Sequence, residues 1–197
     1  MTNHATAPEK KQPAAWVPVL LIGLRLLLIC AVVAGIISLV YAVTLPKVEE
    51  NLREEKRKAI ITIFGTEDLS YTQSETDNAF YTVRYGENGL GYCTEETVGG
   101  FGGDLSLMVG FDADGTVLGV GIISHSETPG LGARVNEADY LAQYRGHSGT
   151  LTLKKDGGSD IDAISGATIS SRAVLSAVNQ ATAHLGKQLA ATGGDAQ

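Results

Sequence analysis

The chain has 197 residues, of which 44% are hydrophobic and 19% charged, with 15 basic side chains against 22 acidic ones. The first 45 residues hold one acidic and three basic side chains, so the remainder, about the length of one domain, carries a net charge of −9. This balance excludes a nucleic-acid-binding protein with a basic footprint. Two cysteines, Cys30 and Cys93, exclude a disulfide framework and a four-cysteine zinc site, and we expect no metal centre.

Residues 26–45 form a run of twenty residues without a charged side chain. A helix rises about 1.5 Å per residue, so this run matches a hydrocarbon core of roughly 30 Å, and Pro46 is expected to end it. Two alternatives are a cleaved signal peptide, for which the run is long, and a lipid anchor on Cys30, which follows the bulky Ile29. The sequence predicts a single-pass anchor in contact with membrane lipid.

The orientation of this anchor is left open by the charges on its two flanks. The flanking basic residues are Lys10, Lys11 and Arg25 on one side, and Lys47, Arg53, Lys56, Arg57 and Lys58 on the other. A plain positive-inside count places the large domain in the cytoplasm. The second set, however, alternates with glutamates, and long domains translocate largely regardless of charge.

The elements after the span follow in the order helix, antiparallel strands, helix, which predicts an α+β domain. Apolar patterns predict helices at residues 45–64, 136–144 and 168–189, and strands at residues 80–85, 105–111, 117–124 and 150–154. Gly65 is expected to end the first helix. Eighteen of the 24 glycines lie between Gly86 and Gly166, which predicts tight turns and close backbone approaches around a ligand.

The sequence offers few candidates for catalysis. The four histidines lack metal-ligand spacing, and neither a nucleophile elbow nor a dinucleotide or phosphate-loop fingerprint is present. His125 and Glu127, two residues apart on a strand, are either a base with its orienting group or two side chains that line one face. We therefore expect no catalytic side chain.

Residues 124–132 (SHSETPGLG) form the first segment of interest. A predicted strand ends here in a Pro-Gly turn, and a second glycine follows Leu131. Such a loop exposes backbone amides and holds one apolar side chain at its tip, so it suits contact with a flat ligand ring. The alternative is a turn without a ligand.

Residues 160–171 (DIDAISGATISS) form the second segment, at the start of the last predicted helix. A helix N-terminus offers unpaired amides and the positive end of a dipole, which favour a phosphate group. Arg172, one turn beyond Thr168, adds a possible charge-assisted contact. The alternative is that Ser165, Thr168 or Ser170 serves only as the helix N-cap.

The second segment resembles the flavinylation signature of FMN-binding domains, Asp-x-x-Ser-Gly-Ala-Thr-x-Ser at residues 162–170. Residues 127–132 (ETPGLG) are similar to the second signature of that family, and residues 154–158 (KKDGG) also fit. With the N-terminal span, the chain is most similar to the G subunit of the Rnf ion-translocating electron-transport complex. The C subunit of the Na⁺-translocating NADH:quinone oxidoreductase is related. One departure is Ser165, where threonine is also common.

The resemblance implies that a flavin transferase moves FMN from FAD onto the hydroxyl of Thr168 as a phosphoester. Ser165, Gly166 and Ala167 are then expected to shape the phosphate site. The residues expected to contact the flavin are Glu127, Thr128, Gly130, Leu131 and Gly132.

The resemblance also divides the chain. The expected parts are an N-terminal tail at residues 1–16, a transmembrane helix with its lead-in at 17–45, a connecting helix at 46–65, an FMN-binding domain at 66–190 and a flexible tail at 191–197. Covalent attachment suits a domain outside the cytoplasm, where a dissociated cofactor is not readily replaced. The resemblance therefore implies a cytoplasmic N-terminus and an FMN domain on the extracytoplasmic face of the inner membrane.

The function implied is that of a redox subunit that carries electrons through covalent FMN within a ferredoxin:NAD oxidoreductase that moves Na⁺ or H⁺. Its partners would be the other membrane subunits of the complex and, during maturation, the flavin transferase. Two alternatives are a stand-alone membrane flavoprotein that feeds another respiratory reductase, and a non-redox, membrane-anchored assembly module.

Overall fold

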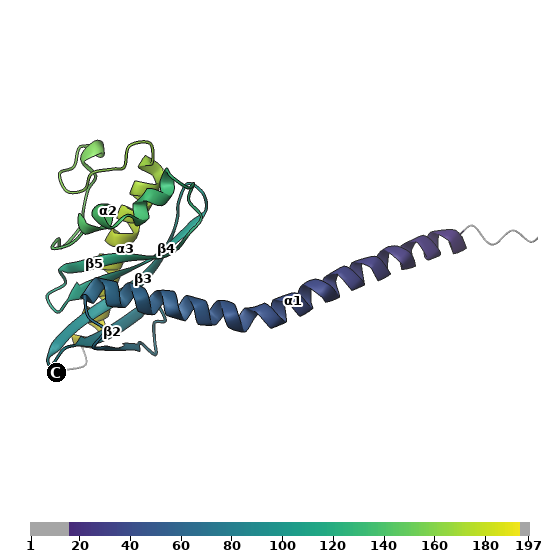
Figure 1. The fold of residues 1–197 in the computed structure, drawn as a ribbon, viewed down its shortest axis with the longest axis horizontal. Coiled ribbons are helices and arrows are strands. Elements are labelled where there is room, and N and C mark those ends of the chain that lie inside the picture. Colours follow the sequence, from purple (N-terminus) through teal and green to yellow (C-terminus); the bar gives the residue numbers. More distant parts are fainter. Residues whose placement is uncertain (1–15, 194–197) are drawn as a thin grey trace, which may run out of the picture. The chain divides into compact units, whose positions relative to one another are not determined.

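The computed structural model describes residues 16–193, and contacts divide the chain into two compact units, Met1–Glu50 and Asn51–Gln197. The elements are α1 (Trp16–Phe64), β1 (Leu69–Gln73), β2 (Phe80–Tyr85), β3 (Gly89–Gly99), β4 (Asp104–Asp112), β5 (Val117–His125), α2 (Ala138–Ala142) and α3 (Thr168–Gly193) (Figure 1). Two 3₁₀ turns lie at Gly132–Asn136 and Lys154–Asp156. Of the predicted tails, residues 1–15 and 194–197 lie outside the described residues.

The first unit contains the apolar part of α1. This helix is long and apolar enough to cross a membrane, and its side chains from residue 19 to residue 50 are all exposed. The uncharged residues 26–45 of this helix form a continuous apolar surface, and a helix satisfies its own backbone hydrogen bonds inside lipid. The predicted apolar helix of membrane-spanning length is therefore confirmed.

Pro46 does not end this helix, contrary to the sequence-based prediction. Helix α1 continues through Pro46 to Phe64, so the span and the connecting helix form one element. Proline removes one backbone donor, and with it the hydrogen bond to the carbonyl four residues earlier, whereas the other residues of the helix keep their backbone donors. Gly65 ends the helix as predicted, with a φ of 69° and a 2.8 Å hydrogen bond from its N–H to the carbonyl of Ile61.

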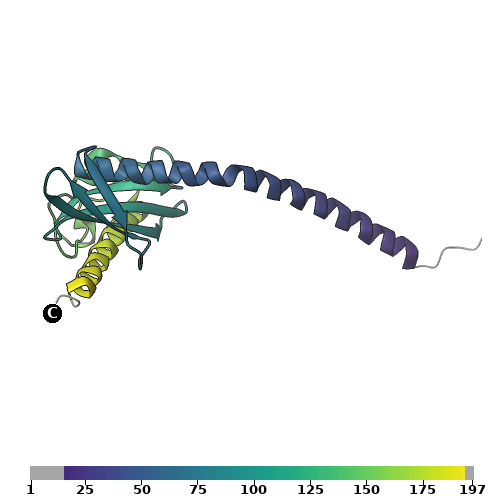
Figure 2. The same ribbon diagram turned by 90° about the horizontal axis from the view of Figure 1, so that it is seen from below.

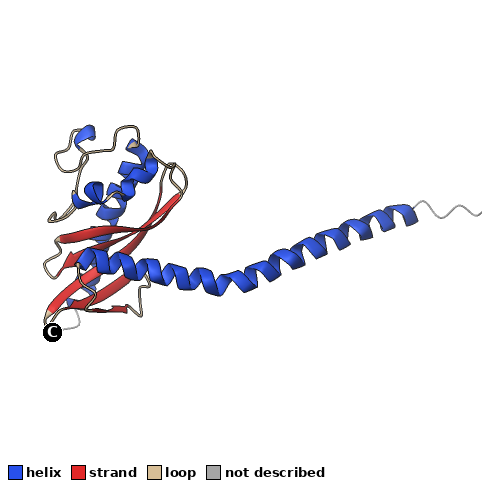
Figure 3. Ribbon diagram, viewed as in Figure 1, coloured by secondary structure: helices blue, strands red, loops and turns tan. Residues whose placement is uncertain are grey.

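The second unit is built on a five-stranded antiparallel sheet in the order β1-β2-β3-β4-β5 (Figure 3). Each strand pairs with its sequence neighbours, as expected for a meander. The three strands predicted at residues 80–85, 105–111 and 117–124 are present. The predicted α+β class is confirmed.

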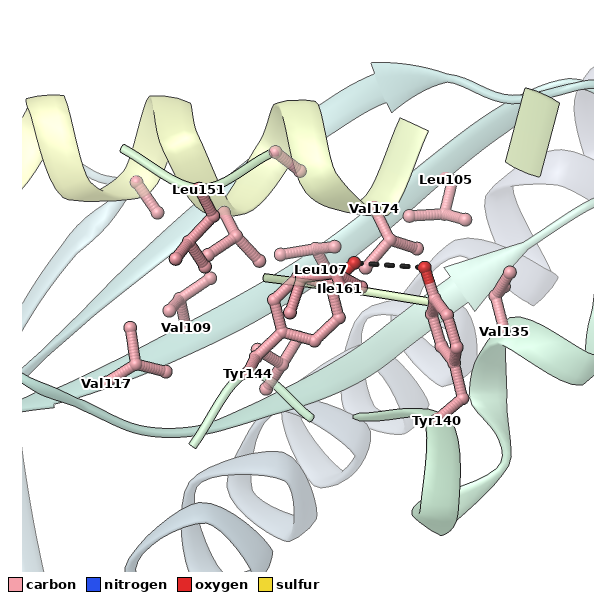
Figure 4. Packing of buried hydrophobic residues seen from close by; sticks show 14 of the residues in the cluster. Leu105, Leu107, Val109, Val117, Val135, Tyr140, Tyr144, Leu151, Ile161 and Val174 are labelled. Atoms are coloured by element: carbon pink, nitrogen blue, oxygen red, sulfur yellow. Dashed lines mark hydrogen bonds between the residues drawn. The ribbon is translucent and has the colours of Figure 1, made fainter. Parts of the chain in front are cut away.

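One face of the sheet packs against α3 and α2. Alternate residues of β4 point to this face, since side chains alternate across a strand. The buried cluster includes Leu105, Leu107, Val109 and Phe111 of β4 and Val174, Ala177, Val178, Ala181 and Leu185 of α3. Tyr140 and Tyr144 close the cluster from the α2 side, with their hydroxyls 3.0 Å apart (Figure 4). Burial of these rings fixes the loops that precede α3.

The opposite face of the sheet holds the last turns of α1 (Figure 2). Three glycines on adjacent strands, Gly91, Gly110 and Gly121, leave room for this helix. A Cβ atom at Gly110 would overlap Cγ2 of Ile63, and one at Gly91 would lie 2.6 Å from Cε1 of Phe64. Several glycines that we attributed to a ligand therefore serve helix packing.

The strand predicted at residues 150–154 is wrong. Leu153 makes only an isolated parallel bridge with Ile161, and a 3₁₀ turn follows it. The carboxylate of Asp160 replaces a strand partner, because it accepts hydrogen bonds from the N–H and the hydroxyl of Thr152 at 2.8 and 2.6 Å. This loop carries Lys154–Asp156 toward the start of α3.

Candidate functional site

A cavity of about 320 Å³ lies at the N-terminus of α3. Its lining comes from four separate parts of the second unit: the β3–β4 loop, the loop after β5, the 3₁₀ turn before residue 157, and the start of α3. The lining residues are Phe101, Thr128, Leu131, Gly132, Lys155, Gly166, Ala167, Thr168, Ile169 and Ser170. The two predicted segments therefore meet at one site.

The apolar wall of this cavity is open to solvent. Phe101, Leu131 and Ile169 are 65%, 44% and 52% exposed, although large apolar side chains of a domain are usually buried. Three such side chains around one cavity form an unsatisfied apolar surface. A planar aromatic ligand would cover part of it.

The polar end of the cavity is formed by Thr168 and Lys155. The ammonium Nζ of Lys155 donates a 2.7 Å hydrogen bond to Oγ1 of the half-buried Thr168. Because an ammonium group only donates, the threonine oxygen is the acceptor and its own hydroxyl hydrogen stays available. A positive charge thus lies beside the hydroxyl of Thr168, the residue that the sequence resemblance predicts as the attachment point.

Two ion pairs flank this contact. Lys154 Nζ lies 2.7 Å from the carboxylate of Asp162, and Arg172 contacts both carboxylate oxygens of Asp156 at 2.9 and 2.6 Å. The hydrogen bonds from Arg172 hold the pKa of Asp156 below its usual value. Arg172, predicted as a possible phosphate contact, is therefore engaged by Asp156.

The first turn of α3 adds backbone donors. No described residue accepts a hydrogen bond from the N–H of Thr168, Ile169 or Ser170, as expected for the start of a helix. Three free amides and the positive end of a 26-residue helix favour an anion at this position. Gly166 precedes them with a φ of 81°, which glycine adopts without strain.

The buried side chain of Glu127 connects two parts of the site, the β3–β4 loop and the first turn of α3. Its side chain is only 5% exposed; Oε1 accepts a 2.7 Å hydrogen bond from the N–H of Phe101, and Oε2 accepts a 2.9 Å bond from the hydroxyl of Ser170. A Cβ atom at Gly132 would overlap Oε2, so only glycine fits there. Three chain segments thus converge on one buried carboxylate.

The structure places the other predicted site residues as follows. Thr128, Leu131, Gly132, Gly166, Ala167 and Thr168 line the cavity, whereas Ser165, Gly130 and Glu127 do not. Leu131 lies over Gly166, where an added Cβ atom would be 2.9 Å from Cδ1 of Leu131. His125 makes a local contact: its Nδ1 accepts a 3.3 Å bond from the N–H of Glu127.

Sequence reasoning missed Phe101 and Ile169 as parts of the site. The helical spacing of apolar residues places Ile169 on the buried face of the last helix, but it is exposed at the cavity. Phe101 lies within a glycine-rich stretch, residues 99–103, that gives no periodic signal. A large aromatic residue surrounded by glycines was the available sign that this loop presents a side chain to a ligand.

Comparison with known proteins identifies the family of this chain. A family profile described as FMN-binding domain matches residues 100–183, which include every residue that lines the cavity. The chain is 31% identical over 173 residues to the G subunit of the ion-translocating oxidoreductase complex of Methanosarcina acetivorans, covering 83% of this chain and 92% of that protein.

Two further proteins are similar. The G subunit of the proton-translocating ferredoxin:NAD(+) oxidoreductase complex of Clostridium ljungdahlii is 29% identical over 160 residues, 80% of this chain and 86% of that protein. A crystal structure of the C subunit of the Na(+)-translocating NADH-quinone reductase from Parabacteroides distasonis aligns with a TM-score of 0.46 and 24% identity, over 52% of this chain and 57% of that one. The resemblance seen in the sequence is confirmed: the chain belongs to the family of G subunits of ion-translocating oxidoreductase complexes.

Proposed function

We propose that this protein carries electrons through an FMN group attached to Thr168 by a phosphoester bond, within a membrane-bound ferredoxin:NAD oxidoreductase complex that moves Na⁺ or H⁺. The observation that carries the proposal is the cavity at the start of α3, where Lys155 contacts Oγ1 of Thr168 beside an exposed apolar wall. Membership of the family makes the chain a redox subunit of a multi-subunit enzyme, with FMN as its cofactor.

The residues that line the cavity suit the ring system and the phosphate group of FMN in their chemistry. Gly132, Gly166 and Ala167 line the cavity without a side chain larger than a methyl group. A Cβ atom at Gly132 or Gly166 would lie closer than 3.0 Å to an atom of a neighbouring residue. Phe101, Leu131 and Ile169 supply apolar surface for a flat ring system. Thr168, Lys155 and the free amides of α3 supply the acceptor oxygen, the positive charge and the donors that a phosphate group needs.

FMN supplies the redox chemistry when it is bound, and the protein binds, orients and shields it. Thr168 fixes the phosphate end to the start of α3. The buried Glu127 carboxylate holds the loops that carry Phe101 and Gly132 against that helix. Ser165 and Gly130, exposed beside the cavity, are proposed to complete the phosphate and ring contacts, respectively.

The partners follow from the same proposal. A flavin transferase installs FMN, other membrane subunits of the complex donate and accept electrons, and lipid surrounds the apolar part of α1. We place the N-terminus in the cytoplasm and the FMN domain on the extracytoplasmic face, where a covalent bond prevents loss of the cofactor. The connecting part of α1 after residue 45 then leads from the membrane to the domain.

Two measurements separate this function from its alternatives. A denaturing gel viewed under ultraviolet light should show a fluorescent band at the mass of this chain, because covalent flavin survives denaturation. A non-redox assembly module would give no such band. Purification from native membranes in mild detergent should recover multi-span subunits with the fluorescent chain, whereas a stand-alone flavoprotein would purify without them.

A further inference from the structure

The cations near Thr168 are not equivalent. Three of them, Lys154, Lys155 and Arg172, come from the 3₁₀ turn before residue 157 and from α3. Lys154 and Arg172 each contact a carboxylate, Asp162 and Asp156 respectively. Lys155 has no carboxylate within ion-pair distance among residues 16–193, and its ammonium group contacts Thr168 instead.

We propose that Lys155 is the side chain that prepares Thr168 for flavinylation and then pairs with the phosphodiester that results, an inference that rests on the proposed function. In the transfer, Thr168 Oγ1 forms a bond to the phosphorus of the FMN half of FAD. The bond from that phosphorus to the bridging oxygen breaks, AMP leaves with the bonding electrons, and the threonine proton passes to a base of the transferase. No atom is oxidised or reduced.

Lys155 acts at two points of this reaction. Its ammonium group already donates to Oγ1, so it stabilises the negative charge that develops on this oxygen as the proton leaves. After transfer, the same ammonium lies beside the oxygen that carries the phosphorus, within reach of the non-bridging phosphate oxygens. A charge-assisted hydrogen bond to them would hold the phosphate at the start of α3.

The ion pair between Arg172 and Asp156 explains why this lysine is available. Asp156 is the next residue in the chain and would compete for Lys155, but Arg172 engages both of its oxygens. Lys155 instead donates to Thr168.

Lys154 provides a matched control. It is the neighbouring lysine in the same turn, it is exposed, and its ion pair has both side chains about half exposed or more, so its loss costs little stability. Lys155→Met, Lys155→Arg and Lys154→Met would be made in the full-length protein in detergent. Each would be incubated with FAD and a flavin transferase, and the initial rate of adduct formation measured by intact mass.

We expect Lys155→Met to slow flavinylation about 10- to 100-fold, the effect of losing one hydrogen bond to a charged group. Lys155→Arg should recover most of the rate, and Lys154→Met should match the unsubstituted protein. An unchanged rate in Lys155→Met, or an equal loss in Lys154→Met, would overturn the inference. Failure of the unsubstituted protein to form any adduct would instead contradict the proposed function.

A second measurement does not depend on the transfer rate. Acetic anhydride modifies exposed lysines, and peptide mapping gives the rate at each one. If Lys155 pairs with the phosphodiester, its acetylation should be slower in the flavinylated protein than in the apoprotein, with the exposed Lys187 as internal reference. Equal acetylation of Lys155 in the two forms would contradict the pairing.

Discussion

Glu127 and Ser170 form a buried hydrogen bond of 2.9 Å across 43 residues of sequence, linking the loop after β5 to the first turn of α3. The other oxygen of Glu127 accepts from the backbone of Phe101. One carboxylate thus links the loops that carry Phe101 and Glu127 to the helix that carries Thr168. This bridge makes the two signatures of the family a single site.

We expect Glu127→Ala to destabilise the second unit by about 1–3 kcal/mol, because it leaves a buried hydroxyl and a backbone N–H without their acceptor. Glu127→Gln should cost much less, since the amide oxygen can accept from Phe101 and the amide nitrogen can donate to Ser170. Thermal unfolding of the full-length protein in detergent measures both. A loss in Glu127→Gln as large as in Glu127→Ala would mean that the charge, and not the bridge, is required.

The packing of α1 on the sheet gives a second prediction. Gly110→Ala should destabilise the protein by about 1–3 kcal/mol, because the new methyl group overlaps Ile63 and forces the helix away from the sheet. Gly119, its cross-strand partner, is the control: a Cβ atom there lies 3.5 Å or more from its neighbours, an ordinary contact. Equal unfolding midpoints for Gly110→Ala and Gly119→Ala would show that α1 does not pack as described.

A pH-dependent contact ties α3 to the sheet. His184 lies between two carboxylates, with Nε2 2.5 Å from Asp77 and Nδ1 2.8 Å from Glu96, and Gln188 also donates to Asp77. Partial burial lowers the pKa of His184, but the hydrogen bonds to Glu96 and Asp77 outweigh it and leave the pKa above 6.5. The hydrogen bond from the N–H of Ala79, followed by that from His184, lowers the pKa of Asp77 below 3.8.

These two directions define a pH window. Stabilisation from a raised histidine pKa is complete below 6.5 and is lost as pH rises through the folded-state value. Stabilisation from Asp77 is present above 3.8 and is lost as pH falls through its lowered pKa. His184→Gln should therefore lower the unfolding temperature more at pH 6 than at pH 9. The same decrease at both pH values would exclude a charged His184 in the folded protein.

The orientation of the anchor can be tested with a single cysteine. Ser159→Cys places an exposed thiol near the site. The two natural cysteines give little background, because Cys30 lies in the apolar part of α1 and burial raises the pKa of the Cys93 thiol. A membrane-impermeant maleimide should label Ser159→Cys in intact spheroplasts. Ala5→Cys, at the other end of the span, should be labelled only after lysis; the reverse pattern would place the domain in the cytoplasm.

Local patterns in the sequence predicted the elements that depend on local residues. Residues 105–111 and 117–124 are apolar runs that flank an Asp-Gly turn, and this pattern identified them as a hairpin. Strand β3 was missed because it carries Glu95 and Glu96 in mid-strand. These charges are tolerated through partners far away in sequence: Lys56 Nζ lies 2.6 Å from Glu95, and His184 contacts Glu96. Single-sequence patterns do not contain such pairs.

The candidate site also has features that local patterns predict and features that depend on residues distant in sequence. Its two signatures follow from residue types around a turn and a helix start, and the resemblance identified them. The burial of Glu127 and the exposure of Ile169 depend on how loops distant in sequence meet. Likewise, the ion pair that leaves Lys155 to Thr168 joins two residues 16 positions apart, Asp156 and Arg172. Spacing alone does not predict which of several cations reaches the threonine.

The mass of the tryptic peptide that ends at Arg172 tests the central claim most directly. With a flavin transferase and FAD, the unsubstituted protein should gain the mass of one FMN less one water on this peptide, with fragmentation placing it at Thr168. Thr168→Val keeps the β-branched shape and removes the hydroxyl, so it should fold, assemble with its partners and carry no adduct. An adduct that persists in Thr168→Val, or that maps to Ser170 or Ser171, would contradict covalent attachment at Thr168.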